Sequence, residues 1–227
     1  MTVPSFFTDN GHVFVAGITG SRDEMGGKTA LSNWWMQTHG SARDLRIFYN
    51  AKGSTCVRGT RVHSVMELAK KMNAGERTFD FVPPTQDWAT PHARLSSFVA
   101  ELPTSMSKMV VHDETPEYED GGEGSLGWFV KVAGQDDGMH AANCKSLVLA
   151  QDPIDAGKSI RKQTDTHVWV GPTSGDYEPY FRTAGFTNHF EHIQREQAPY
   201  QWTVMQGPRD EDRQTYDAVP AEFAEAR

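Results

Sequence analysis

The stretch HVFVAGITGSRDEMGGKTAL, residues 12–31, decides the fold of this chain. Its apolar run at 13–16 is typical of a buried strand. A glycine-rich turn follows, and Gly27, Lys28 and Thr29 open an amphipathic helix. Strand, glycine-rich loop and helix in this order are the context that a phosphate-binding loop needs. The glycines let backbone N–H groups converge on a polyphosphate, and the helix N-terminus adds partial positive charge.

The spacing of this loop departs from the usual G-x-x-x-x-G-K-[ST], because Arg22 stands where the first glycine belongs. If residues 22–26 are an insertion, the remainder is G-x-T-G-S-G-K-T. Lys28 is then expected to reach the β- and γ-phosphates of ATP, and the Thr29 hydroxyl to hold Mg²⁺. The residues expected to surround the nucleotide are Gly17, Thr19, Gly20, Ser21, Gly26, Gly27, Lys28 and Thr29. The alternative is a glycine-rich turn that happens to contain GKT.

The composition indicates one soluble α/β domain. A chain of 227 residues has room for a sizeable core. No apolar run approaches the roughly 18 residues of a membrane span, and the N-terminus MTVPSFFTDNG lacks the features of a secretory signal. Cys56 and Cys144 lie far apart and form no metal-ligand pattern. Reduced thiols and a location in the cytoplasm of a cell are therefore expected.

The net charge of −8, from 30 acidic and 22 basic residues, argues against a whole-surface electrostatic grip on nucleic acid. Any DNA contact is expected to be local, for example a pore lined by a few arginines and lysines in an oligomer. The excess of acidic residues also suits a halophilic protein, although many ordinary proteins are equally acidic.

Apolar periodicity predicts strands and helices that alternate along the chain. Besides 13–16, strands are expected at 45–49, 78–82, 109–111, 145–150, 166–171 and 200–205. Helices are expected at 29–39, 64–72, 93–102, 128–142, 177–184 and 188–195. Alternation of this kind predicts a mostly parallel central sheet with helices on both faces.

The connecting segments follow from glycine, proline and acidic residues. Residues 50–53 are expected to turn the chain out of the preceding strand, and 88–91 and the acidic 115–127 are expected to be loops. A domain spanning residues 12–206 then lies between a short lead-in at 1–11 and an acidic, partly ordered tail at 207–227.

The second informative stretch is MSKMVVHDE, residues 106–114, where an apolar strand ends in His112 and two carboxylates. In a nucleotide-hydrolysing domain, Asp113 binds Mg²⁺ through water, and Glu114 orients and activates the attacking water. An exposed Asp-Glu pair at a strand end is the alternative interpretation. The Gly-Lys-Thr upstream favours the catalytic one.

Polar and basic residues after the next strand have two interpretations each. Gln151 stands at the tip of the strand next to the acidic one, where an amide senses the γ-phosphate and the attacking water; it could equally be a turn residue. Arg161 or Lys162 could serve a neighbouring subunit as an arginine finger or touch DNA. A solvated helix face is the alternative for both.

Two other features favour structural interpretations. The adjacent Trp34 and Trp35 are expected to be core contacts rather than a base-stacking platform. His189 and His192 lie one helical turn apart, but a metal site there lacks a third ligand.

Four segments in this order are G-I-T-G-S…G-G-K-T, a strand ending H-D-E, a strand ending A-Q-D-P, and S-I-R-K-Q-T-D-T-H-V-W-V. Together they resemble the FtsK/HerA superfamily of P-loop ATPases, and especially the small genome-packaging ATPases of membrane-containing archaeal or bacterial viruses. The resemblance covers about residues 12–172. Two departures are the insertion at 22–26 and His112, where the family carries an aliphatic residue.

The resemblance implies a RecA-like fold of the additional-strand (ASCE) P-loop class, with the acidic strand beside the phosphate-loop strand. It implies a ring, commonly hexameric, that moves double-stranded DNA, with a viral portal or membrane protein as a further partner. The protein would act in the host cytoplasm or with the virion. The resemblance implies that Lys28 contacts the phosphates and that Thr29 and Asp113 bind Mg²⁺. It further implies that Glu114 is the catalytic base, that Gln151 is the sensor, and that Arg161 acts across a subunit interface.

Three functions remain open from the sequence. The first is an ATP-driven DNA translocase, in particular a viral packaging motor. The second is a plasmid or virus NTPase switch in partition, conjugation or replication. The third is a degenerate P-loop scaffold that does not hydrolyse nucleotide, which the inserted residues 22–26 favour and the intact Lys28, Thr29, Asp113 and Glu114 oppose.

Overall fold

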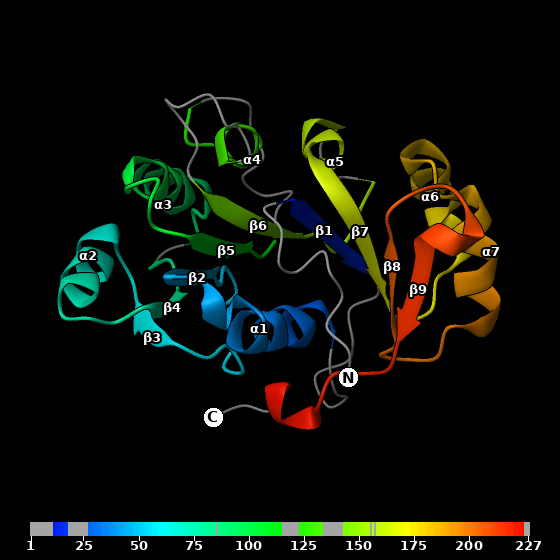
Figure 1. Cartoon of the computed structure of the whole chain (residues 1–227), viewed down its shortest axis with the longest axis horizontal. Helices are drawn as coiled ribbons and strands as arrows, with labels where there is room; N and C mark the ends of the chain where they lie inside the picture. The colour runs from blue at the N-terminus through cyan, green and yellow to red at the C-terminus, as the bar shows by residue number, and fades with distance from the viewer. Residues whose placement is uncertain are drawn as a thin grey trace.

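In the computed structural model, which describes residues 11–17, 27–84, 86–114, 123–133, 143–154, 156 and 158–224, nine strands form one sheet (Figure 1). They are β1 (His12–Gly17), β2 (Leu45–Tyr49), β3 (Thr60–Val62), β4 (Thr78–Phe81), β5 (Lys108–His112), β6 (Cys144–Leu149), β7 (Thr164–Val170), β8 (Trp202–Met205) and β9 (Arg213–Tyr216). Their order across the sheet is β3-β4-β2-β5-β6-β1-β7-β8-β9.

The sheet is mostly parallel, as predicted. Every pairing from β3 across to β7 is parallel, and β8 and β9 add an antiparallel edge. The carboxyl ends of the parallel strands therefore meet at one edge of the sheet, where ligands of open α/β sheets bind. This edge carries Gly17 of β1 and the residues that follow β2, β5 and β6.

One expectation about strand order is wrong: the acidic strand β5 does not lie beside β1. β6 separates them, pairing with β5 through Val110 and Ser146 and with β1 through Val13 and Leu147. The ends of β1 and β5 are thus about 10 Å apart, two strand spacings. All three strands are buried along their whole length, so their sequences carry no mark of which neighbour each one takes.

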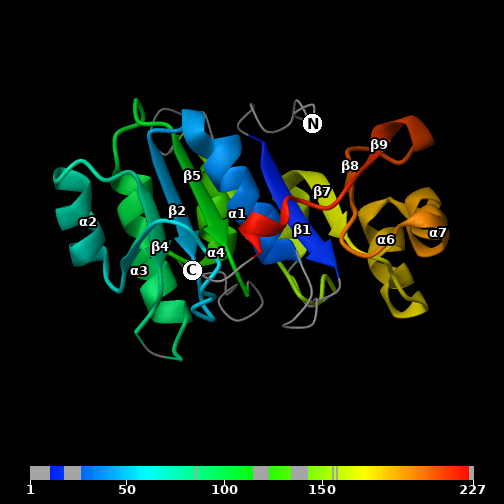
Figure 2. The ribbon, with the colours of Figure 1, turned by 90° about the horizontal axis from the view of Figure 1, so that it is seen from below.

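Helices cover both faces of the sheet, as predicted (Figures 1 and 2). They are α1 (Lys28–Thr38), α2 (Val65–Asn73), α3 (Ala89–Glu101), α4 (Leu126–Ala133), α5 (Lys158–Gln163), α6 (Glu178–Ala184) and α7 (Thr187–Glu196). α1 packs on one face, with Leu31 and Trp35 against Val13 and Val15 of β1. The other helices share the opposite core, which Phe14 enters from the same strand. Alternate residues of β1 thus serve the two layers.

Trp34 and Trp35 are core residues, as predicted, with 6% and 0% of their surface exposed. The indole of Trp35 meets that of Trp202 edge to face at 5.7 Å, which joins α1 to β8. The C-terminal segment runs below α1 in Figure 1 and in front of it in Figure 2, which is seen from below. Its short 3₁₀ helix, η6 (Ala221–Phe223), buries Phe223 in this same core.

Several boundaries differ from those predicted. α3 begins at Ala89, inside the expected loop 88–91; its Pro91 is tolerated in the first turn because N–H groups there have no helical acceptor. α4 begins at Leu126, inside the expected loop 115–127, and the rest of the helix predicted to end at 142 lies outside the described residues. β3 and β9 had no counterpart among the predicted strands. Both are short and half-exposed, so their apolar pattern is weak.

Candidate active site

Gly17 ends β1 where its backbone passes close to β7. Its φ of 139° lies in the region that favours glycine, and a Cβ there would collide with the Val170 carbonyl oxygen. A side chain is therefore excluded at this position. Four of the predicted nucleotide-contacting residues, Thr19, Gly20, Ser21 and Gly26, lie outside the described residues.

The N-terminus of α1 lies at the same edge, with its first backbone N–H groups lacking helical acceptors. Gly27 precedes the helix in an extended conformation and accepts from the Leu31 amide. No side chain caps the helix and none in its first turn is acidic, so far as the described residues go. The partial positive charge of the helix end is thus left for an anion. The half-buried Thr29 lies in this first turn.

Lys28 is buried although it carries an ammonium group, with 7% of its surface exposed. The ammonium donates a 2.8 Å hydrogen bond to the Gly17 carbonyl. Burial lowers the pKa of Lys28 to about 8, while the nearby Asp113 and Glu114 favour the charged form and Lys52 opposes it. The cation is therefore held beside the end of β1 and two carboxylates, with little solvent around it.

Asp113 directly follows β5 and continues its pairing, since the Asp113 amide donates to the Tyr49 carbonyl of β2. The residue is 5% exposed. Burial and the neighbouring Glu114 raise the pKa of Asp113 to about 7, against the opposing charges of Lys28 and Lys52. A positive charge brought to this carboxylate would favour its ionised form.

This donor chemistry fits Mg²⁺. The cation prefers hard oxygen ligands and keeps several waters. The Thr29 hydroxyl, in the first turn of α1, and the Asp113 carboxylate, whose charge acts on the neighbouring Lys28, are oxygen donors of that kind.

Glu114 is held by two donors from the segments that follow β2 and β6. Its backbone is left-handed, with φ of 57°, a conformation that costs an ordinary residue free energy and is retained where packing or function requires it. Its Oε1 lies 2.6 Å from the Lys52 ammonium and accepts a 3.0 Å hydrogen bond from Gln151. The predicted neighbours Glu114 and Gln151 therefore do meet, at the ends of adjacent strands.

Lys52 is the residue at this edge that sequence reasoning missed. It lies in the turn after β2, which forms as predicted with the Gly53 amide donating to the Asn50 carbonyl. The sequence offers only a weak indication of this role, because a lysine in a turn is usually exposed to solvent and has no functional contact. Only the pairing of β2 with β5 brings it to Glu114.

Arg161 lies in α5 and makes its contact within the chain. Its guanidinium donates a 2.7 Å hydrogen bond to the Pro153 carbonyl, in the segment that follows β6. Lys162 is exposed. A role for either residue at a subunit interface stays a prediction.

His112 points away from the carboxylates that follow it. Its Nδ1 lies 3.0 Å from Nε2 of His92, and its ring meets Phe129, so it is buried under α3 and α4. Burial lowers the pKa of both histidines, that of His92 to about 3. The neutral imidazole of His112 is therefore part of the core.

His189 contacts the Gly207 carbonyl at 2.7 Å, and His192 pairs with Glu196. Across the described part of the chain, no three or more histidine, cysteine or acidic side chains are arranged to hold a metal ion.

No protein-family description and no curated protein matches this chain. Solved structures do. The genome packaging NTPase B204 of Sulfolobus turreted icosahedral virus 2, in complex with ATP-gammaS, superposes with a TM-score of 0.67 at 9% identity, over 94% of this chain and 99% of that one. VirB4 of Thermoanaerobacter pseudethanolicus gives 0.62 at 9% identity, over 94% and 91%. The pCW3 conjugation coupling protein TcpA gives 0.51 at 12%, over 93% and 61%.

At these identities the likeness concerns the fold. The chain has the RecA-like P-loop fold and resembles the viral packaging ATPases in structure, as predicted from its motifs. No helix among the residues that the structure describes is long and apolar enough to span a bilayer.

Proposed function

We propose that this chain is an ATPase that binds Mg²⁺ and ATP at the carboxyl edge of its sheet. One observation carries the proposal. The residues that the sequence predicts for nucleotide binding and hydrolysis come from three strand ends and one helix N-terminus, and they lie together at that edge. Lys28 contacts Gly17, Glu114 contacts Gln151, and the charges of Asp113 and Glu114 act on Lys28.

Each of these side chains would have its own role in ATP binding and hydrolysis. Lys28 exchanges the Gly17 carbonyl for β- and γ-phosphate oxygens, which a buried ammonium attracts strongly. Thr29 and Asp113 would hold Mg²⁺, whose positive charge would stabilise the negative charge that develops on the phosphates. Glu114 orients the attacking water and accepts its proton, and the Gln151 amide contacts the γ-phosphate and that water.

We further propose that hydrolysis drives translocation of double-stranded DNA, with genome packaging as the biological role. Support comes from the structural likeness to a viral genome packaging NTPase over nearly the full length of both chains. A homo-oligomeric ring, expected to be hexameric from the resemblance, would place Arg161 near a neighbour's nucleotide. Because the net charge is −8, DNA contacts would be confined to a basic strip inside that ring.

A second candidate is an NTPase acting in conjugation. The likeness to VirB4 and to a conjugation coupling protein favours it. The two candidates share the nucleotide chemistry and differ in how DNA acts on it.

The test is steady-state ATP hydrolysis over a range of KCl concentrations, with and without double-stranded DNA, for the natural chain and Glu114→Gln. Turnover that rises with DNA and falls at least about 100-fold in the variant supports the translocase and Glu114 as base. Turnover indifferent to DNA supports the NTPase switch. Absence of both binding and turnover at every salt concentration would overturn the ATPase proposal and favour a scaffold.

A further inference from the structure

The ion pair between Lys52 and Glu114 involves the carboxylate that is proposed above as the catalytic base. The Lys52 ammonium lies 2.6 Å from Glu114 Oε1, the same oxygen that accepts from Gln151. An ammonium in contact with a carboxylate opposes proton transfer to either of its oxygens, because neutralising the carboxylate leaves the ammonium without its partner charge. The exposed fractions of the two side chains, 44% and 14%, place the pair at the rim of the site.

The turn that carries Lys52 is held closed by a buried amide. The Asn50 side chain is 0% exposed; its Oδ1 accepts from the Ser54 amide at 2.7 Å and its Nδ2 donates to the Ser54 carbonyl at 2.9 Å. Both ends of the turn are thus fixed to one side chain. This closure fixes the backbone from which the Lys52 side chain reaches Glu114.

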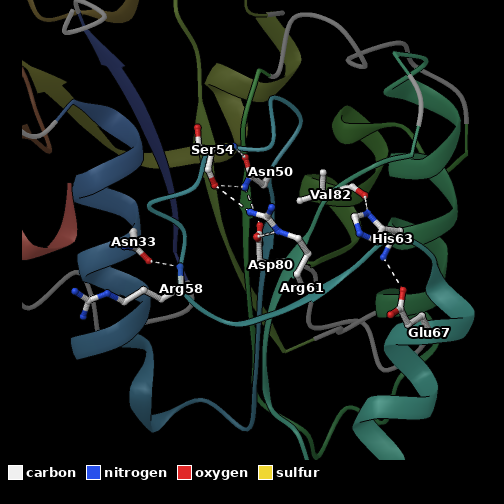
Figure 3. Close-up of polar contacts among 9 residues, drawn as sticks. All are labelled: Asn33, Asn50, Ser54, Arg58, Arg61, His63, Glu67, Asp80 and Val82. Atoms are coloured by element: carbon white, nitrogen blue, oxygen red, sulfur yellow. Dashed lines mark hydrogen bonds and ion pairs between the residues drawn. The ribbon is translucent and has the colours of Figure 1, made fainter. Parts of the chain in front are cut away.

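Asn50 is in turn fixed to the edge of the sheet (Figure 3). Its Nδ2 donates at 2.8 Å to Asp80 Oδ1, and the other oxygen of Asp80 accepts at 2.7 Å from the Arg61 guanidinium of β3. Asp80 is 1% exposed, whereas the Arg61 side chain is 43% exposed. We call Asn50, Asp80 and Arg61 the tether; it runs from the turn to the surface at the edge strand.

We propose that Lys52 is a positioning residue that restrains Glu114 between rounds of hydrolysis, and that the tether sets this restraint. The inference rests on the proposed ATPase function. For Glu114 to take a water proton on either oxygen, its carboxylate has to give up the ion pair with the Lys52 ammonium. Half-exposed ion pairs are weak, so the restraint slows the resting enzyme without blocking it, and a modest movement of the turn releases it.

The test compares Lys52→Met, Lys52→Arg and Arg61→Gln, with Lys70→Met on the exposed face of α2 as the control for loss of one positive charge. We expect Lys52→Met to raise kcat without DNA by about three- to tenfold, with KM for ATP changed less than twofold. Lys52→Arg, which keeps the charge, should stay within twofold of the natural chain. Arg61→Gln should raise kcat in the same direction but less.

Other outcomes overturn the inference. A lower kcat in Lys52→Met would make Lys52 a residue that supports the reaction, and a raised KM alone would make it a nucleotide contact. An unchanged kcat would make the pair a surface contact without consequence. If the natural chain shows no turnover, the ATPase proposal fails and this inference fails with it; if the natural chain is active, only the inference is at stake.

A second measurement tests the contact without nucleotide. Thermal unfolding of Lys52→Met, Glu114→Gln and the double variant forms a double-mutant cycle. We expect the changes in Tm to be non-additive. Additive changes would show that the two side chains do not interact, which would overturn the inference whatever the kinetics.

Discussion

The Lys28 ammonium donates a 2.8 Å hydrogen bond to the Gly17 carbonyl, so the first residue of α1 is bound to the last residue of β1. The two ends of the glycine-rich segment thereby meet although residues 18–27 separate them. An insertion in this segment can lengthen the loop while leaving the lysine at the end of the strand.

The first prediction concerns this lysine. Lys28→Met should weaken ATP binding at least tenfold, because a charge-assisted hydrogen bond contributes about 1.5–3 kcal/mol. The measurement is titration with a fluorescent ATP analogue, and Lys131→Met on α4, which removes an exposed charge, is the control. Equal affinities in the two variants would contradict the assignment.

The same variant should not lose stability without nucleotide. The folded pKa of Lys28 is lowered from 10.5 to about 8, so its contribution to stability is present above pH 10.5 and lost as pH falls through 8. At pH 7 Lys28 is charged, and the cost of burying this charge lowers the free energy of unfolding by up to roughly 3 kcal/mol. Removing the charge relieves this penalty, and we expect Tm at pH 7 to stay level or rise.

Gly17→Ala should be strongly destabilising. A Cβ would stand 2.8 Å from the Val170 nitrogen and closer still to its carbonyl oxygen, and a φ of 139° excludes an ordinary residue. We expect a loss of more than about 3 kcal/mol of unfolding free energy, or no folded protein. Gly175→Ala, where nothing lies within 4 Å of the added carbon, should change stability by less than about 1 kcal/mol. Similar urea midpoints for both variants would refute the close contact.

Buried histidines should make the fold acid-sensitive. Burial lowers the pKa of His92 to about 3 and those of His12 and His167 to about 4. Each contributes stability that is present above pH 6.5 and is lost as pH falls toward its folded pKa. Between pH 7 and 5 the loss is about 2 kcal/mol per histidine.

His92→Gln should therefore shrink the fall in Tm between pH 7 and 5, because glutamine does not titrate. His63→Gln serves as its control, since the His63 ring lies at the surface beside the Val82 carbonyl (Figure 3). A fall in Tm as large in His92→Gln as in the natural chain would mean that His92 does not contribute to acid unfolding.

The C-terminal segment should contribute to global stability. Phe223 is 6% exposed, its ring lies 4.3 Å from the Arg58 guanidinium carbon, and its carbonyl accepts from Asn33 of α1. Phe223→Ala should cost about 2–4 kcal/mol in chemical denaturation. Met66→Ala, at a side chain 82% exposed, should cost less than about 0.5 kcal/mol. An effect of Phe223→Ala no larger than this would mean that the segment is detached in solution.

Much of the fold was predictable because its signals are local. The strand 45–49 was predicted with the bounds that β2 has, and the helix predicted at 64–72 is α2 with Ser64 as its N-cap, accepting from the Glu67 amide. Apolar periodicity and a capping side chain act within a few residues, so they can be read without knowing the partners of an element. The short edge strands lacked this signal, since only one side of each is paired.

Three features were determined by the sequence itself, since each depends on residues close together in the chain. They are the strand–loop–helix unit that carries Gly17 and Lys28, the strand that ends in two carboxylates, and the strand that is followed by Gln151. Tertiary structure alone decided that β6 lies between β1 and β5, that Lys52 reaches Glu114, and that residues 217–224 pack beneath α1. Strand pairing and cross-chain contacts depend on which apolar faces fit when all layers pack together, and that free energy belongs to the assembled core rather than to any one segment.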